Sequence, residues 1–459
     1  MKKAALVRGS VVRHLMALTW PMILGMLSLS MFNLVDTYFV GQLGVEQLAA
    51  MGFTFPVVTL INSFALGLGI GAGAGVSRAI GREDYRRAAR ITTDGMMIAV
   101  FLAVVLSLVG LLTIEPVFRF LGADAAVMPY IRDYMSVWYL GVAFVVVPMV
   151  GNNAIRATGD SRSPALVMLV AGISNAIFDY LLIFGIGPFP EMGIRGAALA
   201  TVIGRFLTLL VAVRILVRRE RLLVWSRPRL TSLLESGKNL LQVGLPVALT
   251  RVMQPVSIGV LTALLAYYGN QAVAGFGVAT RIEMLLLVVL QSFASVLAPF
   301  GGQNYGAGEL CRVRSSLRLA VWFSIGNGIL VTVLVYAAGP RVLALFTDDA
   351  IALQEAVLYL RIAAPGYVFY GILQSVSSLL NVTDRPGLAA GLNLAQMFAV
   401  CVPLALVLRV FWGSAGIYLA LSLSWLVLAL CALFFWYRHL RCRKTQSAGT
   451  PVGLAGSGD

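Results

Sequence analysis

The chain has 459 residues, of which 59% are hydrophobic and only 12% are charged, and its net charge is +15. Soluble domains carry about 25% charged residues, so this composition excludes an ordinary soluble enzyme, and it equally excludes a disordered chain. A helix needs about 20 apolar residues to cross a bilayer. The length leaves room for about a dozen such helices with short loops, so we predict a polytopic membrane protein.

Twelve apolar stretches follow one another along the chain, each long enough to span a bilayer with some tilt. Six lie at about 15–40, 47–75, 88–112, 133–155, 164–186 and 194–217. Six more lie at about 239–265, 272–300, 312–337, 357–380, 387–409 and 415–437. The pattern predicts an all-α membrane protein with lobes at 1–217 and 238–442, a cytoplasmic interfacial linker at 218–237 and a disordered cytoplasmic tail at 443–459.

Basic residues are distributed unevenly between the two sides of these spans. If the N-terminus is cytoplasmic, the loops and termini on that side hold 26 of the 35 Lys and Arg residues, and the opposite side holds six. The remaining three, Arg205, Arg251 and Arg281, fall inside spans. Because basic loops stay in the cytoplasm, we expect both termini there, and the positive charge needs no nucleic-acid partner to explain it.

The two halves are related by an internal repeat. Identical residues recur at a constant spacing of 225 positions. The pairs are Pro21 and Pro246, Gly44 and Gly269, Gly81 and Gly306, Arg87 and Arg312, Asp124 and Asp349, Tyr134 and Tyr359, and Thr158 and Thr383. Each repeat has six spans, so both begin on the same side of the membrane. We therefore expect a pseudo-two-fold axis along the membrane normal. Such duplication suits a carrier whose lobes rock around a central site, and a channel or receptor does not require it.

Two acidic residues, Asp36 and Asp179, lie within predicted spans of the first half. An ionised carboxylate there costs at least ~2.5 kcal/mol, so a proton or cation site is the favoured interpretation and a structural hydrogen bond is the alternative. Asn175 lies four residues before Asp179 on the same helix face, and Thr201 lies at a similar depth on the next span. These side chains are expected to converge. Two neighbouring carboxylates cannot both ionise cheaply, which suits a proton carrier, and the same oxygens suit Na⁺.

The second half lacks these carboxylates. At the offset of 225, Asp36 aligns with Leu261 and Asp179 with Leu404, so coupling is predicted to be confined to the first lobe. The main charges in the second half's spans are Arg281 and Glu283. They are interpreted either as members of structural ion pairs with other helices or as substrate contacts.

Further candidates line the same spans. Pro21 removes one helical hydrogen bond, so it marks either a static kink or a hinge that bends when Asp36 changes protonation. Asn152, Asn153 and Gln254 are predicted to add weak polar groups to a cavity. The sequence contains no Walker A, HExxH or GxSxG motif, so neither ATP hydrolysis nor another enzymatic activity is predicted, and no cofactor is expected besides the coupling ion.

The chain resembles the MATE family of multidrug and toxic compound extrusion transporters. The resemblance rests on the two six-span halves, the spacing from Pro21 to Asp36, the pair Asn175 and Asp179, and the loop Arg156–Pro164. It covers the whole chain except the tail. It is closest to the prokaryotic DinF-like branch, because the carboxylates lie in the first lobe, whereas NorM-like and eukaryotic members carry acidic residues in the seventh span.

The resemblance implies secondary antiport through the inner membrane of a bacterium or archaeon. H⁺ or Na⁺ enters, and a drug-like, cationic or aromatic compound leaves. It also implies that Asp36 is the main protonation site, that Pro21 is the bend point and that Asn152 contacts the substrate. The implied network around Asp36, which is also the candidate Na⁺ site, is completed by Asn175, Asp179, Thr201 and Tyr134. The sequence departs from the family pattern at Phe32, where a tyrosine is expected.

Two other functions remain open at this point. A lipid-linked oligosaccharide flippase of the same superfamily is the first, although flippases usually have fourteen spans and a cationic cavity. A passive channel is the second. We expect a monomer in the lipid bilayer whose partner is its small-molecule substrate.

Overall fold

The computed structural model describes residues 6–224 and 230–439, so the expected tail at 443–459 lies outside the described residues. The first repeat comprises α1 (Val11–Gly41), α2 (Val45–Gly81), α3 (Tyr85–Phe120), α4 (Met128–Leu140), α5 (Val142–Ala157), α6 (Arg162–Phe184), α7 (Gly193–Arg214) and the π-helix η1 (Ile215–Glu220). The second repeat comprises α8 (Leu230–Ala266), α9 (Asn270–Gly306), α10 (Leu310–Leu343), α11 (Ala350–Ala363), the 3₁₀ helix η2 (Ala364–Gly366), α12 (Tyr367–Val382), α13 (Pro386–Leu394), the π-helix η3 (Ala395–Cys401) and α14 (Val402–His439). We call the two sets the first lobe and the second lobe.

These helices make the twelve predicted crossings. In the described part of the chain, ten helical segments are long and apolar enough to cross a membrane, and α4 with α5, bent by 46°, forms an eleventh. One of the ten, Pro386–Arg438, has 53 residues, which is about 80 Å of helix against a ~30 Å hydrocarbon core. Gly413 interrupts it with a φ of 60° and a ψ of −137°. The chain reverses there, since Gly416 packs on the carbonyl oxygen of Leu408. This segment therefore makes two crossings.

The repeat is visible in backbone detail. Asp124 accepts hydrogen bonds from the amides two and three residues further on, at 3.1 and 2.9 Å. Asp349 accepts the same two bonds at 2.8 and 3.0 Å. Gly44 and Gly269, which precede α2 and α9, both have positive φ, at 137° and 104°. The predicted offset of 225 therefore relates equivalent turns of the two lobes.

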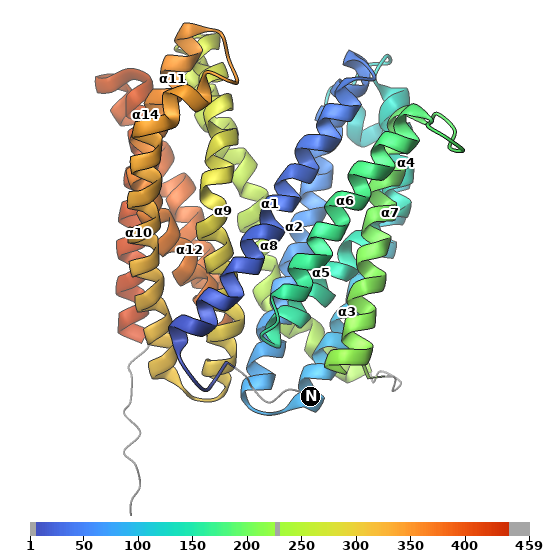
Figure 1. Ribbon diagram of the computed structural model, residues 1–459, viewed down its shortest axis with the longest axis vertical. Helices are drawn as coiled ribbons and strands as arrows, with labels where there is room; N and C mark the ends of the chain where they lie inside the picture. The colour runs from blue at the N-terminus through green and yellow to red at the C-terminus, as the bar shows by residue number, and fades with distance from the viewer. Residues whose placement is uncertain (1–5, 225–229, 440–459) are drawn as a thin grey trace, which may run out of the picture.

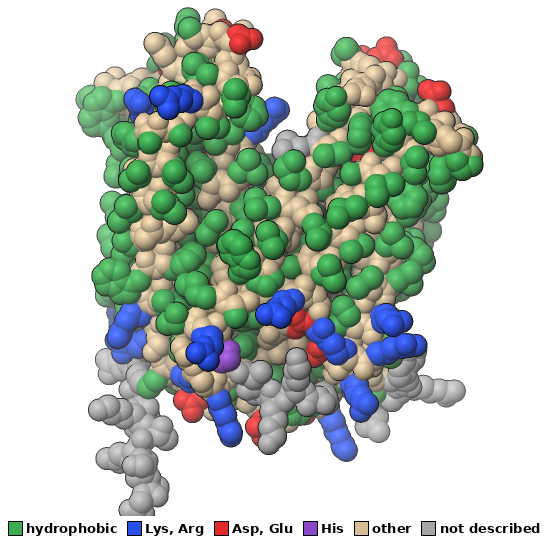
Figure 2. Space-filling view, in the orientation of Figure 1, with side chains coloured by type: hydrophobic (Ala, Val, Ile, Leu, Met, Phe, Trp, Pro, Cys, Tyr) green, Lys and Arg blue, Asp and Glu red, His purple; other side chains and the backbone are tan. Residues whose placement is uncertain are grey.

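The lobes meet at one end of the molecule and diverge at the other (Figure 1). Basic side chains gather at the end where the lobes meet, and a notch separates the lobes at the opposite end (Figure 2). We call the first end, where α2 ends and α8 begins, the basic side. The end where α1 stops and α9 begins is the open side. The notch between the lobes is called the cleft.

The first helix of each repeat packs against the opposite lobe near the basic side. Leu15 and Met22 of α1 are fully buried in a cluster with Phe293 and Phe300 of α9. Figure 1 shows α1 rising from beneath the second lobe to the first lobe. Likewise, Leu240 of α8 belongs to the core of the first lobe. Each lobe is therefore tied to the other by a whole helix.

Two kinds of contact between the lobes hold the basic side closed. Nε2 of Gln303 on α9 donates a hydrogen bond to the carbonyl oxygen of Ala157, at the end of α5, at 2.7 Å. Arg78 on α2 pairs with Asp384, in the turn between α12 and α13. Helix α8 begins at Leu230, within the stretch expected to be a linker. The connection between the lobes is therefore partly helical.

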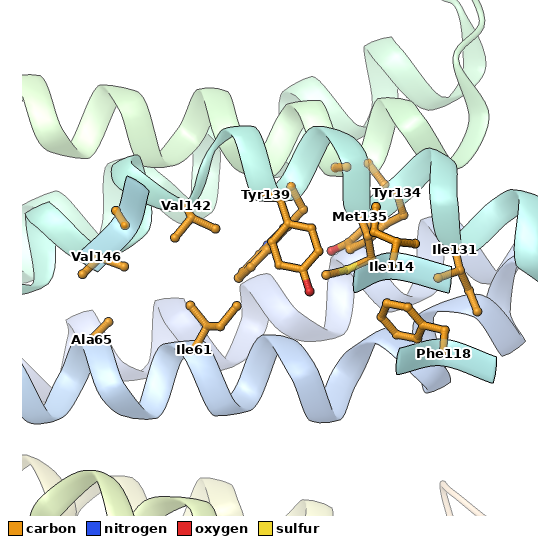
Figure 3. Close-up of a cluster of buried hydrophobic side chains, with 14 of the residues drawn as sticks. Ile61, Ala65, Ile114, Phe118, Ile131, Tyr134, Met135, Tyr139, Val142 and Val146 are labelled. Carbon is orange, nitrogen blue, oxygen red and sulfur yellow. The ribbon is translucent and has the colours of Figure 1, made fainter. Parts of the chain in front are cut away.

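A buried apolar cluster fixes the position of α4 in the first lobe. Tyr134 and Tyr139 on α4 lie among side chains that include Ile61 of α2 and Ile114 and Phe118 of α3 (Figure 3). Tyr134 is 5% exposed. Its ring is held by this packing, so the place of its hydroxyl is set by the core of the lobe.

Candidate ion-coupling site

Asp36 and Asp179 come together in the first lobe. Each lies five residues before the end of its helix, α1 or α6, toward the open side. Their side chains are 7% and 0% exposed. The two carboxyl groups lie close enough to influence each other, and the hydroxyl of Tyr134 lies near both. The sequence-predicted pair therefore forms one buried acidic site, with the tyrosine beside it.

Small residues allow α1 and α6 to approach each other. A Cβ at Gly172 would lie 2.8 Å from Oγ of Ser28, and one at Gly25 would lie 3.0 Å from Cα of Ala165. Close helix packing of this kind is common in membranes, where small residues let backbones approach. Asp36 consequently reaches Asp179 on the neighbouring helix.

The amide of Asn175 joins α6 to α7. In the orientation that matches donors with acceptors, its Nδ2 donates to Oδ2 of Asp179 at 2.7 Å and its Oδ1 accepts from the backbone amide of Thr201 at 3.3 Å. Asn175 is 1% exposed and Thr201 is 8% exposed. The structure thus brings the five sequence-predicted coupling residues together from α1, α4, α6 and α7.

One oxygen of this site is unpaired. Oδ1 of Asp36 is buried and has no hydrogen-bond partner among the described residues. A buried polar atom left unpaired costs about 1–3 kcal/mol, and more when it is charged. A proton on Asp36, or a small cation beside it, would relieve that cost. Carboxylate, amide and hydroxyl oxygens suit either one.

A small cavity adjoins the site toward the basic side. Its volume is about 10 Å³, and Asn175, Thr201, Phe32 and Arg205 are among the residues that line it. That volume is close to the space one water molecule needs. The guanidinium of Arg205 lies 5.6 Å from the centre of the Phe32 ring. Sequence reasoning placed Arg205 inside a span but missed its position next to this site.

Glu283 of the second lobe is hydrogen-bonded to a tyrosine. Its Oε2 accepts from the hydroxyl of Tyr359 at 2.8 Å, while its Oε1 is buried without a partner in the described part of the chain. Tyr367 lies beside it. Tyr359 is the repeat equivalent of Tyr134. The two lobes therefore place equivalent tyrosines beside acids that come from different helices.

The other sequence-predicted residues lie away from this site. Asn153 is engaged within the first lobe: its Nδ2 donates to the carbonyl oxygen of Met149 at 2.7 Å and its Oδ1 accepts from Arg156 at 2.8 Å. Oδ1 of Asn152 is buried and unpaired among the described residues. Pro21 lies inside α1, which continues as one helix around it. Gln254 on α8 and Arg281 on α9 are exposed.

Comparisons with known proteins agree with this architecture. The family model MatE matches the chain twice, at residues 21–181 and 246–407. The chain is 35% identical to an FAD transporter of Shewanella oneidensis over 446 residues, which cover 97% of this chain and 98% of that protein. It is 24% identical to the multidrug export protein MepA of Staphylococcus saprophyticus, over 95% of this chain and 96% of that protein. Among solved structures, it is similar to the Vibrio cholerae MATE transporter VcmN in the bent form, with a TM-score of 0.88 and 28% identity over 94% of this chain and 97% of that chain.

The two family matches start at Pro21 and Pro246, so they reproduce the offset of 225 found in the sequence. Together they cover more than half of the chain. The matched relatives are transporters rather than enzymes, and their coverage is nearly complete in both directions. The chain belongs to the MatE family of multi-pass membrane transporters.

Proposed function

We propose that this protein is a cation-coupled antiporter that exports small organic molecules while H⁺ or Na⁺ enters the cell. The observation that carries the proposal is the buried pair Asp36 and Asp179, with one oxygen of Asp36 unpaired. A buried acid near the open side is placed to exchange a cation with that side. The cargo class expected from the sequence is drug-like, cationic or aromatic. The name of the Shewanella relative adds flavin nucleotides to the candidates.

The orientation follows from charge. Basic loops stay in the cytoplasm, so the basic side is assigned to the cytoplasm, together with both termini. The open side then faces the exterior, and the arrangement of the lobes is that of an outward-facing transporter. The membrane is proposed to be the inner membrane of a bacterium or archaeon. We propose a monomer with no cofactor besides the coupling ion.

The cycle begins when a cation reaches the acidic pair from the open side. Uptake of a proton by Asp36 removes a negative charge beside Asp179 and changes the hydrogen bonds of Asn175. Helix α1 then bends at Pro21, which has no N–H to bond the carbonyl oxygen of Ala17. The first lobe's side of the cleft narrows and releases the cargo. If Na⁺ is the coupling ion, oxygens of Asp36, Asn175, Asp179 and Thr201 are available to hold it.

The flippase remains the alternative function. The twelve crossings and the buried acids of the first lobe favour antiport, because a lipid-linked sugar requires a broad cavity rather than a coupling site. Dye efflux and translocation of a lipid-linked oligosaccharide, measured on the same proteoliposomes, separate the two functions.

The test is export in proteoliposomes under an imposed pH or sodium gradient. Asp36→Asn is expected to abolish uphill transport, because the amide cannot exchange a cation. Asp133→Asn is the matched control, since Asp133 pairs with Arg195 at the surface, 3.5 Å from it. Full uphill export by Asp36→Asn would contradict the proposal.

A further inference from the structure

We infer that the second-lobe wall of the cleft is an anion-binding surface formed by Arg251 and Arg281. The cargo that fits it is an aromatic molecule bearing phosphate, a class to which flavin nucleotides belong. The inference rests on the proposed function, because it names the cargo of that export cycle.

Arg251 lies on the face of α8 that touches the first lobe nearer the basic side. Leu240 and Gly244 of α8 pack against Gly71 and Gly67 of α2. Arg251 is seven residues beyond Gly244 and eleven beyond Leu240, which places it within about 20° of both around the helix. It stands about 10 Å further toward the open side than Gly244. The lobes diverge in that direction (Figure 1), so we infer that this face of α8 is turned toward the cleft.

Arg281 occupies the equivalent face of α9. Gln303 and Gly306, at the basic end of α9, contact α2 of the first lobe. Arg281 precedes them by 22 and 25 residues, so it lies within about 40° of both around the helix. Gly277, one turn further toward the open side, has no atom within 4 Å of the place a Cβ would take. This part of α9 is therefore not covered by other residues of the described chain, and we infer that it is turned toward the cleft.

Both guanidinium groups are available to a ligand. Arg251 and Arg281 are exposed, and neither forms a salt bridge within residues 6–224 and 230–439. Glu283 lies about 160° away from Arg281 around α9, and its carboxylate accepts from Tyr359 instead. An arginine at this depth is expected to face water rather than lipid. Two free guanidinium groups on one wall are the donors that phosphate oxygens prefer.

An aromatic ring stands beside the charge. Tyr370 of α12 is half-buried and lies within electrostatic range of both Arg251 and Glu283. Its ring also packs edge-on against Trp425, at 5.5 Å between centroids. The planar ring of a ligand can therefore lie beside Tyr370 while Arg251 binds the phosphate of the same ligand. This combination of arginine and tyrosine suits a nucleotide better than a simple inorganic anion.

The repeat shows that Arg251 and Arg281 have no basic equivalents in the first lobe. At the offset of 225, Arg251 aligns with Met26 and Arg281 with Pro56. Asp36 conversely aligns with Leu261 in the second lobe. The two lobes have therefore diverged in opposite senses: the first carries the cation site, and the second carries the anion site. An anionic cargo and a coupling cation then never compete for the same side chains.

The test uses FAD and the cationic dye ethidium as parallel cargoes in proteoliposomes under one fixed gradient. Arg251→Gln and Arg281→Gln are each expected to raise the KM for FAD about tenfold, and ethidium export is expected to change less than about twofold. Arg361→Gln is the matched control, because Arg361 is exposed and its guanidinium lies over the Tyr336 ring, 5.5 Å from its centre. Arg251→Lys should recover part of the FAD affinity.

Binding of FAD to the detergent-solubilised protein, followed by quenching of flavin fluorescence, gives a second readout that does not need transport. FAD binding that is unchanged in the double Gln variant overturns the inference. Equal losses of FAD and ethidium export also overturn it, because they indicate a structural role for the arginines. If wild-type protein exports ethidium but does not bind FAD, only the cargo assignment fails. If Asp36→Asn exports either cargo uphill, the proposed function itself fails.

Discussion

Gly81 and Gly306 make the same contact from opposite sides of the pseudo-two-fold axis. A Cβ on Gly81 would overlap the carbonyl oxygen of Gln303, and a Cβ on Gly306 would overlap the carbonyl oxygen of Arg78. The glycines are 225 residues apart, and so are Arg78 and Gln303. One contact is therefore made twice, where α2 and α9 touch backbone to backbone. It closes the basic side, so the proposed rocking cycle requires it to open.

Gly81→Ala is predicted to disfavour the closed basic side. Overpacking costs about 1–3 kcal/mol, which is enough to shift a two-state equilibrium by about fivefold to 100-fold. Ser77, fully buried beside Gly302, is the reporter position. In a background without the native cysteines, Ser77→Cys should be alkylated faster when Gly81→Ala is present. Gly259→Ala, where no atom lies within 4 Å of the added Cβ, should leave the labelling rate unchanged.

Asp36 and Asp179 are predicted to behave as one site. Each single change to Asn should lower gradient-driven export by at least about tenfold, because either change alters the charge shared by the pair. The double variant should lose no more than the worse single variant, since residues that act as a unit are not additive. The initial rate of dye export is measured for all three variants under the same gradient. Losses that multiply would instead indicate two independent cation sites.

Tyr134 and Tyr359, which are repeat equivalents, are predicted to differ in role. Tyr134→Phe removes the hydroxyl beside the acidic pair, so it should change the cation concentration that gives half-maximal export. Tyr359→Phe removes the donor to Glu283 and leaves a buried carboxylate oxygen unpaired, at a cost of about 1–3 kcal/mol. It should lower the Tm in detergent and leave the cation dependence unchanged. If Tyr359→Phe instead changed the cation dependence and Tyr134→Phe only lowered the Tm, coupling would lie in the second lobe.

Much of the fold follows from sequence patterns, because the length of each apolar stretch and the offset between the repeats can be read directly from the order of the residues. The acidic pair was also predictable, since Asn175 and Asp179 share a helix face and Asp36 lies at a similar depth. The crossing of α1 and α8 was not, because lipid-facing and core-facing side chains in a membrane are equally apolar. The donor to Glu283 was not predictable either, since Tyr359 is 76 residues away. The start of α8 at Leu230 was hidden by polar residues that interrupt the apolar pattern.

Pro21→Ala is predicted to slow the transport cycle without weakening cargo binding. Alanine restores the N–H that bonds the carbonyl oxygen of Ala17, so α1 becomes stiffer where bending is required. Turnover in proteoliposomes should fall by about tenfold, whereas the Kd for dye in detergent should change little. Pro116→Ala, a proline within α3 near the open side, is the control for a general effect of removing a helix proline. If turnover falls equally in both variants, α1 has no special role as a hinge. If Pro21→Ala retains full turnover, the cycle must proceed by tilting of α1 as a rigid helix.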